Sequence, residues 1–147
     1  MSILLQKHQS ETVKFLSEKC VNQHGLLIYH NMGTGKTLTS LFIILKKITN
    51  SELNIKDILI VCPSTIQSTW IIESMKLNLN LKSDNFLEYE ELNELIITSG
   101  KKNKNLFKGK FLVLDECHHI LPYLKKEHHE NYFLFLEILN RTQHCLL

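Results

Sequence analysis

A glycine-containing loop that ends in lysine and threonine is the strongest chemical signal in the sequence. Residues 30–37 read His-Asn-Met-Gly-Thr-Gly-Lys-Thr, between a short apolar run and a segment of helical periodicity. Gly33 and Gly35 let the backbone curl, so that successive amides converge on phosphate oxygens at a helix N-terminus. Lys36 would contact the β- and γ-phosphates, and the Thr37 hydroxyl would ligate Mg²⁺. The predicted phosphate cradle consists of Met32, Gly33, Thr34, Gly35, Lys36 and Thr37.

Two adjacent carboxylates, Asp115 and Glu116, form the second signal. They directly follow the apolar run at residues 111–114. Side chains that follow a strand at the carboxyl edge of an α/β sheet lie where such folds bind ligands. Asp115 would hold Mg²⁺ through water, and Glu116 would orient and deprotonate the water that attacks the γ-phosphate. Together with Lys36, these two residues are the predicted catalytic groups for hydrolysis of ATP.

Short apolar runs alternate with helical patterns along the chain, which is the signature of βαβ units on a parallel sheet. Strands are predicted at residues 25–29, 57–62, 86–89, 111–114 and 144–147, and helices at residues 6–20, 36–47, 64–75 and 129–141. The predicted fold is therefore α/β, with a mainly parallel sheet flanked by helices. The length of 147 residues fits one domain. The nucleotide is expected at the carboxyl edge of the strands.

The composition is that of an ordinary soluble globular protein, with 44% hydrophobic and 22% charged residues. A net charge of +2 is too small to mark a dedicated nucleic-acid module, so any contact with nucleic acid must be local. The four cysteines have no close spacing, which favours a reducing compartment. No apolar stretch approaches the roughly 20 residues of a membrane span, so we expect an intracellular protein without a membrane segment.

Several stretches resemble one family of ATPases. Asp115-Glu-Cys-His resembles motif II of superfamily 2 helicases, in the variants grouped with the DEAH-type enzymes. Gln9 is similar to the glutamine with which Swi/Snf-like members read adenine. Ile58-Leu-Ile-Val-Cys-Pro-Ser-Thr, followed by Trp70, resembles motif Ia. His30 stands where the usual loop pattern begins with glycine. The combination of Tyr29-His30 with Asp115-Glu-Cys-His-His119 is most similar to the Swi/Snf-like ATPases of large cytoplasmic DNA viruses, including the poxvirus nucleoside triphosphatases I.

This resemblance implies a RecA-like lobe that holds ATP and Mg²⁺. It also implies that Ser64 and Thr65 face a nucleic-acid backbone. The parent enzyme would be a DNA-dependent ATPase that translocates on double-stranded DNA in viral transcription or genome processing, in the cytoplasm of an infected cell, in the virion or in the nucleus. The family places motif III directly after a strand such as residues 144–147 and adds a second RecA-like lobe. We therefore expect residues 1–147 to be a lobe truncated before motif III, which binds ATP without meaningful turnover.

Other functions compete with this interpretation. A non-catalytic nucleotide-binding or interaction module would keep the loop but not the hydrolysis. A phosphate-loop kinase would need a lid with arginines, and the chain has a single arginine, Arg141. The cysteine and histidines near residue 118 lack the spacing of a structural zinc site.

Several single residues also have a structural alternative. Gln9 could be an exposed helix residue, and Ser64 or Thr65 could cap the helix that they begin. The lysines of residues 101–110 could contact a phosphate backbone, but they are expected instead in a solvated loop. The aromatic side chains expected to face the core are Phe15, Trp70, Tyr132, Phe133 and Phe135.

Overall fold

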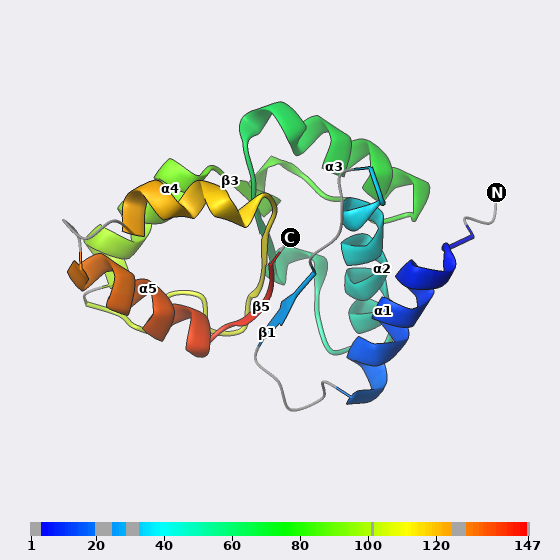
Figure 1. The fold of residues 1–147 in the computed structure, drawn as a ribbon, viewed down its shortest axis with the longest axis horizontal. Coiled ribbons are helices and arrows are strands. Elements are labelled where there is room, and N and C mark those ends of the chain that lie inside the picture. The colour runs from blue at the N-terminus through cyan, green and yellow to red at the C-terminus, as the bar shows by residue number, and fades with distance from the viewer. Residues whose placement is uncertain (1–3, 20–24, 29–32, 101, 125–128, 147) are drawn as a thin grey trace.

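Five parallel strands form one sheet in the computed structural model, in the order β1-β5-β4-β2-β3 (Figure 1). The structure describes residues 4–19, 25–28, 33–100, 102–124 and 129–146. The strands are β1 (Gly25–Leu27), β2 (Ile58–Val61), β3 (Phe86–Leu87), β4 (Phe111–Leu114) and β5 (Gln143–Leu146). This arrangement confirms the predicted α/β class and the parallel sheet. Because the chain returns to the same end of the sheet before each strand, all carboxyl ends meet at one edge.

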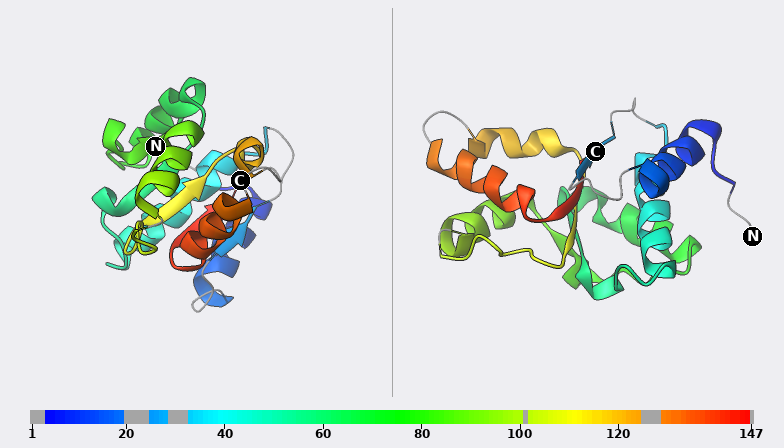
Figure 2. Two further views of the ribbon diagram at one scale, coloured as in Figure 1. Left: turned by 90° about the vertical axis from the view of Figure 1, so that its left-hand side faces the viewer. Right: turned by 90° about the horizontal axis from the view of Figure 1, so that it is seen from below.

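Helices cover both faces of the sheet. In Figure 1, α1 (Lys7–Lys19), α2 (Lys36–Thr49) and α3 (Ser64–Lys76) lie on one side, and α4 (Tyr89–Leu95) and α5 (His129–Asn140) lie on the other. The view from below in Figure 2 separates the same two groups. Shorter turns are η1 (Ile55–Asp57), η2 (Ser83–Asn85), η3 (Ile96–Gly100) and η4 (Cys117–Leu124). In the described part of the chain, no helix is long and apolar enough to cross a membrane.

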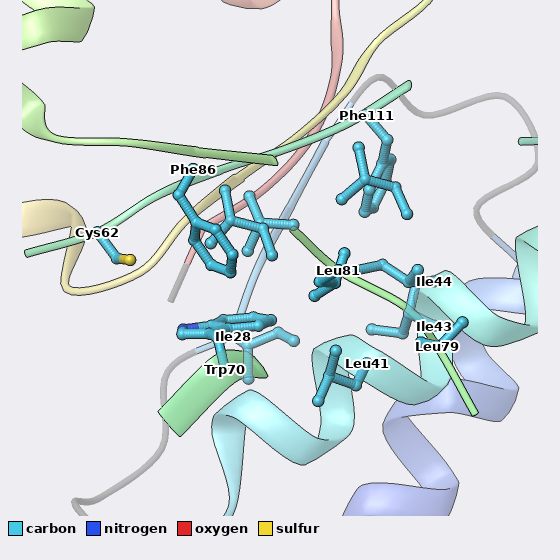
Figure 3. Close-up of a cluster of buried hydrophobic side chains, with 13 residues drawn as sticks. Ile28, Leu41, Ile43, Ile44, Cys62, Trp70, Leu79, Leu81, Phe86 and Phe111 are labelled. Carbon is cyan, nitrogen blue, oxygen red and sulfur yellow. The ribbon is translucent and has the colours of Figure 1, made fainter. Parts of the chain in front are cut away.

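Two hydrophobic clusters fill the space between the sheet and its helices. Ile58 and Ile60 of β2 belong to the cluster under α2 and α3, which Figure 3 shows, whereas Val61 belongs to the cluster under α4 and α5. In the same way, Phe111 and Val113 of β4 face the first cluster and Leu112 and Leu114 the second. Alternate side chains of a strand point to opposite faces. The continuous apolar runs of β2 and β4 are therefore explained by burial on both faces.

The structure corrects some expectations about the elements. β3 ends at Leu87, and Tyr89 begins α4 instead of ending the strand. Trp70 and Phe135 are buried as predicted, but Phe133 is 65% exposed. Successive helical residues are about 100° apart, so Phe133 and Phe135 face opposite sides of α5 and cannot both meet the core. The prediction was also wrong for Phe15 and Tyr132, which are exposed.

Candidate nucleotide-binding site

The predicted loop and the predicted carboxylates meet at the carboxyl edge of the sheet. Lys36 begins α2, after the loop that follows β1, and Glu116 follows β4 by two residues. The ammonium Nζ of Lys36 lies 3.8 Å from Oε1 of Glu116. β1 and β4 are not neighbours, because β5 lies between them. The sheet thus brings together two groups that are far apart in the sequence and come from non-adjacent strands.

The described part of the loop has the backbone shape that its glycines allow. Gly33 and Gly35 both have φ of 78°, in the left-handed region, and Gly35 is the N-cap residue of α2. The carbonyl of Gly35 accepts hydrogen bonds from the backbone amide and the hydroxyl of Thr39, at 2.9 and 3.0 Å. Because the loop follows β1, the first turn of α2 lies at the carboxyl edge of the sheet. A helix N-terminus in this position attracts anions. Met32, predicted in the cradle, lies outside the described residues.

Helix α1 supports the loop through Gln9. The side chain is 4% exposed, and its Nε2 donates to the carbonyls of Thr34 and Gly35 at 3.2 and 3.3 Å. Its Oε1 accepts from the backbone amide of Gln6 at 2.9 Å. Nε2 of His8 lies 3.1 Å from the carbonyl oxygen of Thr34. The alternative of an exposed helix residue was therefore wrong, and the reading of adenine by Gln9 stays a prediction.

Asp115 is held by hydrogen bonds from both layers of helices. Its side chain is 4% exposed, and Nε1 of Trp70 in α3 donates to its Oδ2 at 2.8 Å. The hydroxyl of Tyr89 in α4 donates to its backbone carbonyl at 2.8 Å. Burial raises the pKa of the Asp115 carboxyl, while the bond from Trp70 acts in the opposite direction.

Sequence reasoning assigned Trp70 to the core and missed its hydrogen bond to Asp115. The available signal was that a buried indole N–H needs an acceptor.

Glu116 has a strained backbone, and its carboxylate lies close to the side chains of Lys36 and His118. Its φ is 55°, in the left-handed region that costs about 1–2 kcal/mol for a residue with a Cβ atom. Oε1 faces Lys36, and Oε2 lies 3.4 Å from Nδ1 of His118. The ring of His118 packs on that of His119, which stacks on Tyr89. Backbone strain of this kind is concentrated at functional sites, which fits a carboxylate directed toward the loop.

The two predicted nucleic-acid contacts begin α3. Ser64 and Thr65 are exposed, and Pro63 occupies the N-cap position. The alternative that one of them caps the helix was therefore wrong. Since α3 follows β2, its N-terminus lies at the same sheet edge as the loop.

Two lysines of the predicted solvated loop are engaged within the protein. Nζ of Lys104 lies 2.8 Å from Glu137, and Nζ of Lys110 donates to the carbonyl of Lys56 at 2.8 Å. These bonds fasten the loop to α5 and to η1, which weakens the case for contact with a phosphate backbone.

The side-chain oxygens at the site suit a magnesium nucleotide. Thr37 and Asp115 offer a hydroxyl and a carboxylate, the hard oxygen donors that Mg²⁺ prefers. Among the residues that the structure describes, no group of three or more histidines, cysteines or acidic residues could hold a metal by itself. Mg²⁺ in phosphoryl-transfer sites is usually bound by one or two protein oxygens together with substrate phosphates. The residues present therefore fit the metal in its complex with nucleotide.

The parallel sheet, with helices on both faces and the loop and carboxylates at its carboxyl edge, defines the class of protein, an α/β lobe of the RecA-like fold. The sequence profile of the SNF2-related domain matches residues 8–104, and the chain belongs to this family. The Sulfolobus solfataricus SWI2/SNF2 ATPase core, solved in complex with double-stranded DNA, has a similar fold with a TM-score of 0.66 and 17% identity, and the match covers 98% of this chain and 31% of that chain. The resemblance to Swi/Snf-like ATPases is thereby confirmed.

Two relatives extend the comparison. The early transcription factor 70 kDa subunit of Melanoplus sanguinipes entomopoxvirus is 30% identical over 129 residues, which cover 76% of this chain and 18% of that protein. The human transcriptional regulator ATRX is 31% identical over 101 residues, 63% of this chain and 4% of ATRX. The chain thus spans less than a fifth of either relative.

Proposed function

We propose that this chain is the ATP-binding lobe of a nucleic-acid-dependent ATPase of the DNA translocase type. The observation that carries the proposal is the distance of 3.8 Å between Lys36 Nζ and Glu116 Oε1. With Lys36 as the cation for the γ-phosphate and Glu116 as the base for the attacking water, this distance supports hydrolysis of a nucleoside triphosphate, which needs both groups close together.

The proposed binding roles are those that the loop sequence and the two carboxylates suggest. The amides of Met32 to Thr37 would cradle the phosphates, and Lys36 would neutralise their charge. Thr37 and Asp115 would hold Mg²⁺, which would supply positive charge to neutralise the negative charge that develops on the phosphates. Gln9 would support the loop and read the adenine base from the same position. This is one RecA-like lobe over residues 1–147.

The chemical step needs one base and one leaving group. Glu116 would accept a proton from water as the water oxygen forms a bond to the γ-phosphorus. The bond from the γ-phosphorus to the β–γ bridging oxygen breaks, and ADP leaves with that oxygen. An additional cation, such as an arginine from a second RecA-like lobe, is worth about 10³ to 10⁵ in rate where such residues have been measured. We therefore expect this chain alone to bind ATP with little turnover.

Ser64 and Thr65 would contact the sugar-phosphate backbone of double-stranded DNA. Two observations support this part of the proposal. Both residues are exposed at the N-terminus of α3, and the similar ATPase core was solved with double-stranded DNA. A role in viral transcription or genome processing is supported by the entomopoxvirus relative, whose name describes a transcription factor.

Calorimetric titration of Mg²⁺-ATP and of a non-hydrolysable analogue into the chain tests the proposal. We expect saturable binding by the wild type and loss of binding in Lys36→Ala. Lys46→Ala is the matched control, because it removes the same charge from the exposed side of the same helix. Absence of binding by a folded wild-type chain would overturn the proposal. If a longer parent protein bound ATP but never hydrolysed it with DNA present, the non-catalytic module would be favoured instead.

A further inference from the structure

The indole of Trp70 forms a buried hydrogen bond with the predicted metal ligand. Trp70 is completely buried, and its Nε1 lies 2.8 Å from Oδ2 of Asp115, a residue 45 positions later in the chain. An indole has one N–H donor and no acceptor, so this bond has a single direction. The partner is a carboxylate that burial already shields from water. The contact therefore determines how the carboxylate can lie.

We propose that Trp70 is a positioning residue of the metal site, which fixes the orientation of the Asp115 carboxylate before Mg²⁺-ATP binds. This inference rests on the proposed function, because it takes Asp115 as the ligand. Groups that hydrogen-bond a metal ligand from behind restrict its rotation, and their loss commonly lowers metal affinity about 10- to 100-fold. Trp70 acts through Asp115 and does not itself touch the substrate.

The two helix layers hold different parts of Asp115. Trp70 comes from α3 and fixes the side chain, whereas Tyr89 comes from α4 and fixes the backbone carbonyl. The backbone amide of Asp115 also donates to the carbonyl of Val61 in β2 at 2.9 Å. These two other hydrogen bonds hold the main chain of Asp115, but they leave its side-chain carboxylate able to rotate, and this rotation is the variable in question. That variable is the one that Trp70 restrains.

A purely structural role for Trp70 makes a different prediction. Trp70 lies in the hydrophobic cluster of Figure 3 together with Phe86. If it served packing alone, Trp70→Phe would lower stability and affect binding with and without metal alike. Phe86→Leu is the matched control, because it removes aromatic volume from the same cluster and leaves Asp115 its donor.

The first experiment measures the affinity of the full chain for a fluorescent ATP analogue, in Mg²⁺ and in EDTA. In Trp70→Phe we expect affinity in Mg²⁺ to fall about 10-fold or more, while affinity in EDTA stays near that of the wild type. In Phe86→Leu the ratio of the two affinities should equal that of the wild type. An unchanged ratio in Trp70→Phe, or an equal change in both variants, would overturn the inference.

A second measurement needs no substitution of Trp70. The chain contains one tryptophan, so selectively excited tryptophan fluorescence reports on the surroundings of Trp70, which include this bond. With ATP analogue saturating in EDTA, addition of excess Mg²⁺ should shift the emission in the wild type and leave it unchanged in Asp115→Ala. If the emission of the wild type does not change when Mg²⁺ is added, the inference is contradicted. This result does not depend on whether Trp70→Phe folds. If the folded wild type binds no nucleotide in either condition, the proposed function fails and this inference fails with it. If Trp70→Phe keeps the metal-dependent binding of the wild type, only the inference about Trp70 fails.

Discussion

Gln9 and Gly35 are in contact across the packing of α1 against α2. Nε2 of Gln9 donates to the Gly35 carbonyl at 3.3 Å, and a Cβ atom built on Gly35 would lie 2.3 Å from the same nitrogen. The glycine is thus required twice, once for its φ of 78° and once for the space that the amide occupies. The loop and the first helix constrain each other through this contact.

Gly35→Ala is predicted to destabilise the chain more than Gly109→Ala. Both glycines have positive φ, but a Cβ on Gly109 meets nothing within 4 Å, so that substitution carries only the backbone cost of about 1–2 kcal/mol. At Gly35 the displaced amide also loses its bonds to the loop, each worth about 1 kcal/mol. Denaturant unfolding measures both free energies. In a Gln9→Ala background the cost of Gly35→Ala should shrink, and strict additivity of the two substitutions would disprove the contact.

Glu116→Gly is predicted to be more stable than Glu116→Ala by about 1 kcal/mol. Elsewhere in a folded chain glycine is usually the more destabilising of the two, because it loses more backbone entropy. Here φ is 55°, which glycine adopts without strain and alanine does not. Thermal or denaturant unfolding of the two variants is the direct comparison. The usual order, with alanine the more stable, would mean that the left-handed conformation at this residue is incorrect.

Glu116→Gln is predicted to bind Mg²⁺-ATP about fivefold more tightly than the wild type, which is about 1 kcal/mol. The amide removes the negative charge beside the phosphates and releases Lys36 from its ion pair. Calorimetry measures the change, and Glu94→Gln, an exposed residue of α4, is the control for loss of one charge. Weaker binding by Glu116→Gln than by the wild type would place Glu116 in binding instead of catalysis.

Cys62 is predicted to resist alkylation at pH 8.5 in the folded chain. Burial raises the pKa of this thiol from 9.0 to about 12, with the charges of Asp115 and Glu88 acting in the same direction. A group whose folded pKa is raised contributes stability that is present below its unfolded value and is lost as the pH rises through the folded value. The unfolding free energy should therefore decline between about pH 9 and 12, and less so in Cys62→Ala. Peptide mapping after iodoacetamide treatment reads the modification, and rapid labelling of native Cys62 would contradict the burial.

The sequence alone was sufficient for the features that depend on local pattern. The apolar runs at β2 and β4 could be recognised because both faces are buried, and the spacing of glycine, lysine and threonine indicated the turn before α2. Asp115 and Glu116 could be placed at the sheet edge because they directly follow a strand. These inferences need only short stretches of chain.

What the sequence could not provide depends on how helices rotate and pack. Neither the burial of Gln9 nor its bonds to the loop follow from α1 alone, since they require the position of α2. Phe133 was assigned to the core because an aromatic side chain usually packs there, yet the rotation of α5 exposes it. The bond from Trp70 to Asp115 joins elements that no local pattern connects.

Helix α3 would carry both proposed roles, the DNA contact and the positioning of Asp115, on one element. Ser64 and Thr65 stand at its exposed end, and Trp70 lies within two turns of them, about 9 Å along the axis. A ligand that tilts the helix by its N-terminus therefore also moves the hydrogen-bond donor of Asp115. Such a displacement would couple the binding of DNA to the binding of Mg²⁺-ATP. If DNA raises the affinity for Mg²⁺-ATP by a given factor, Mg²⁺-ATP must raise the affinity for DNA by the same factor.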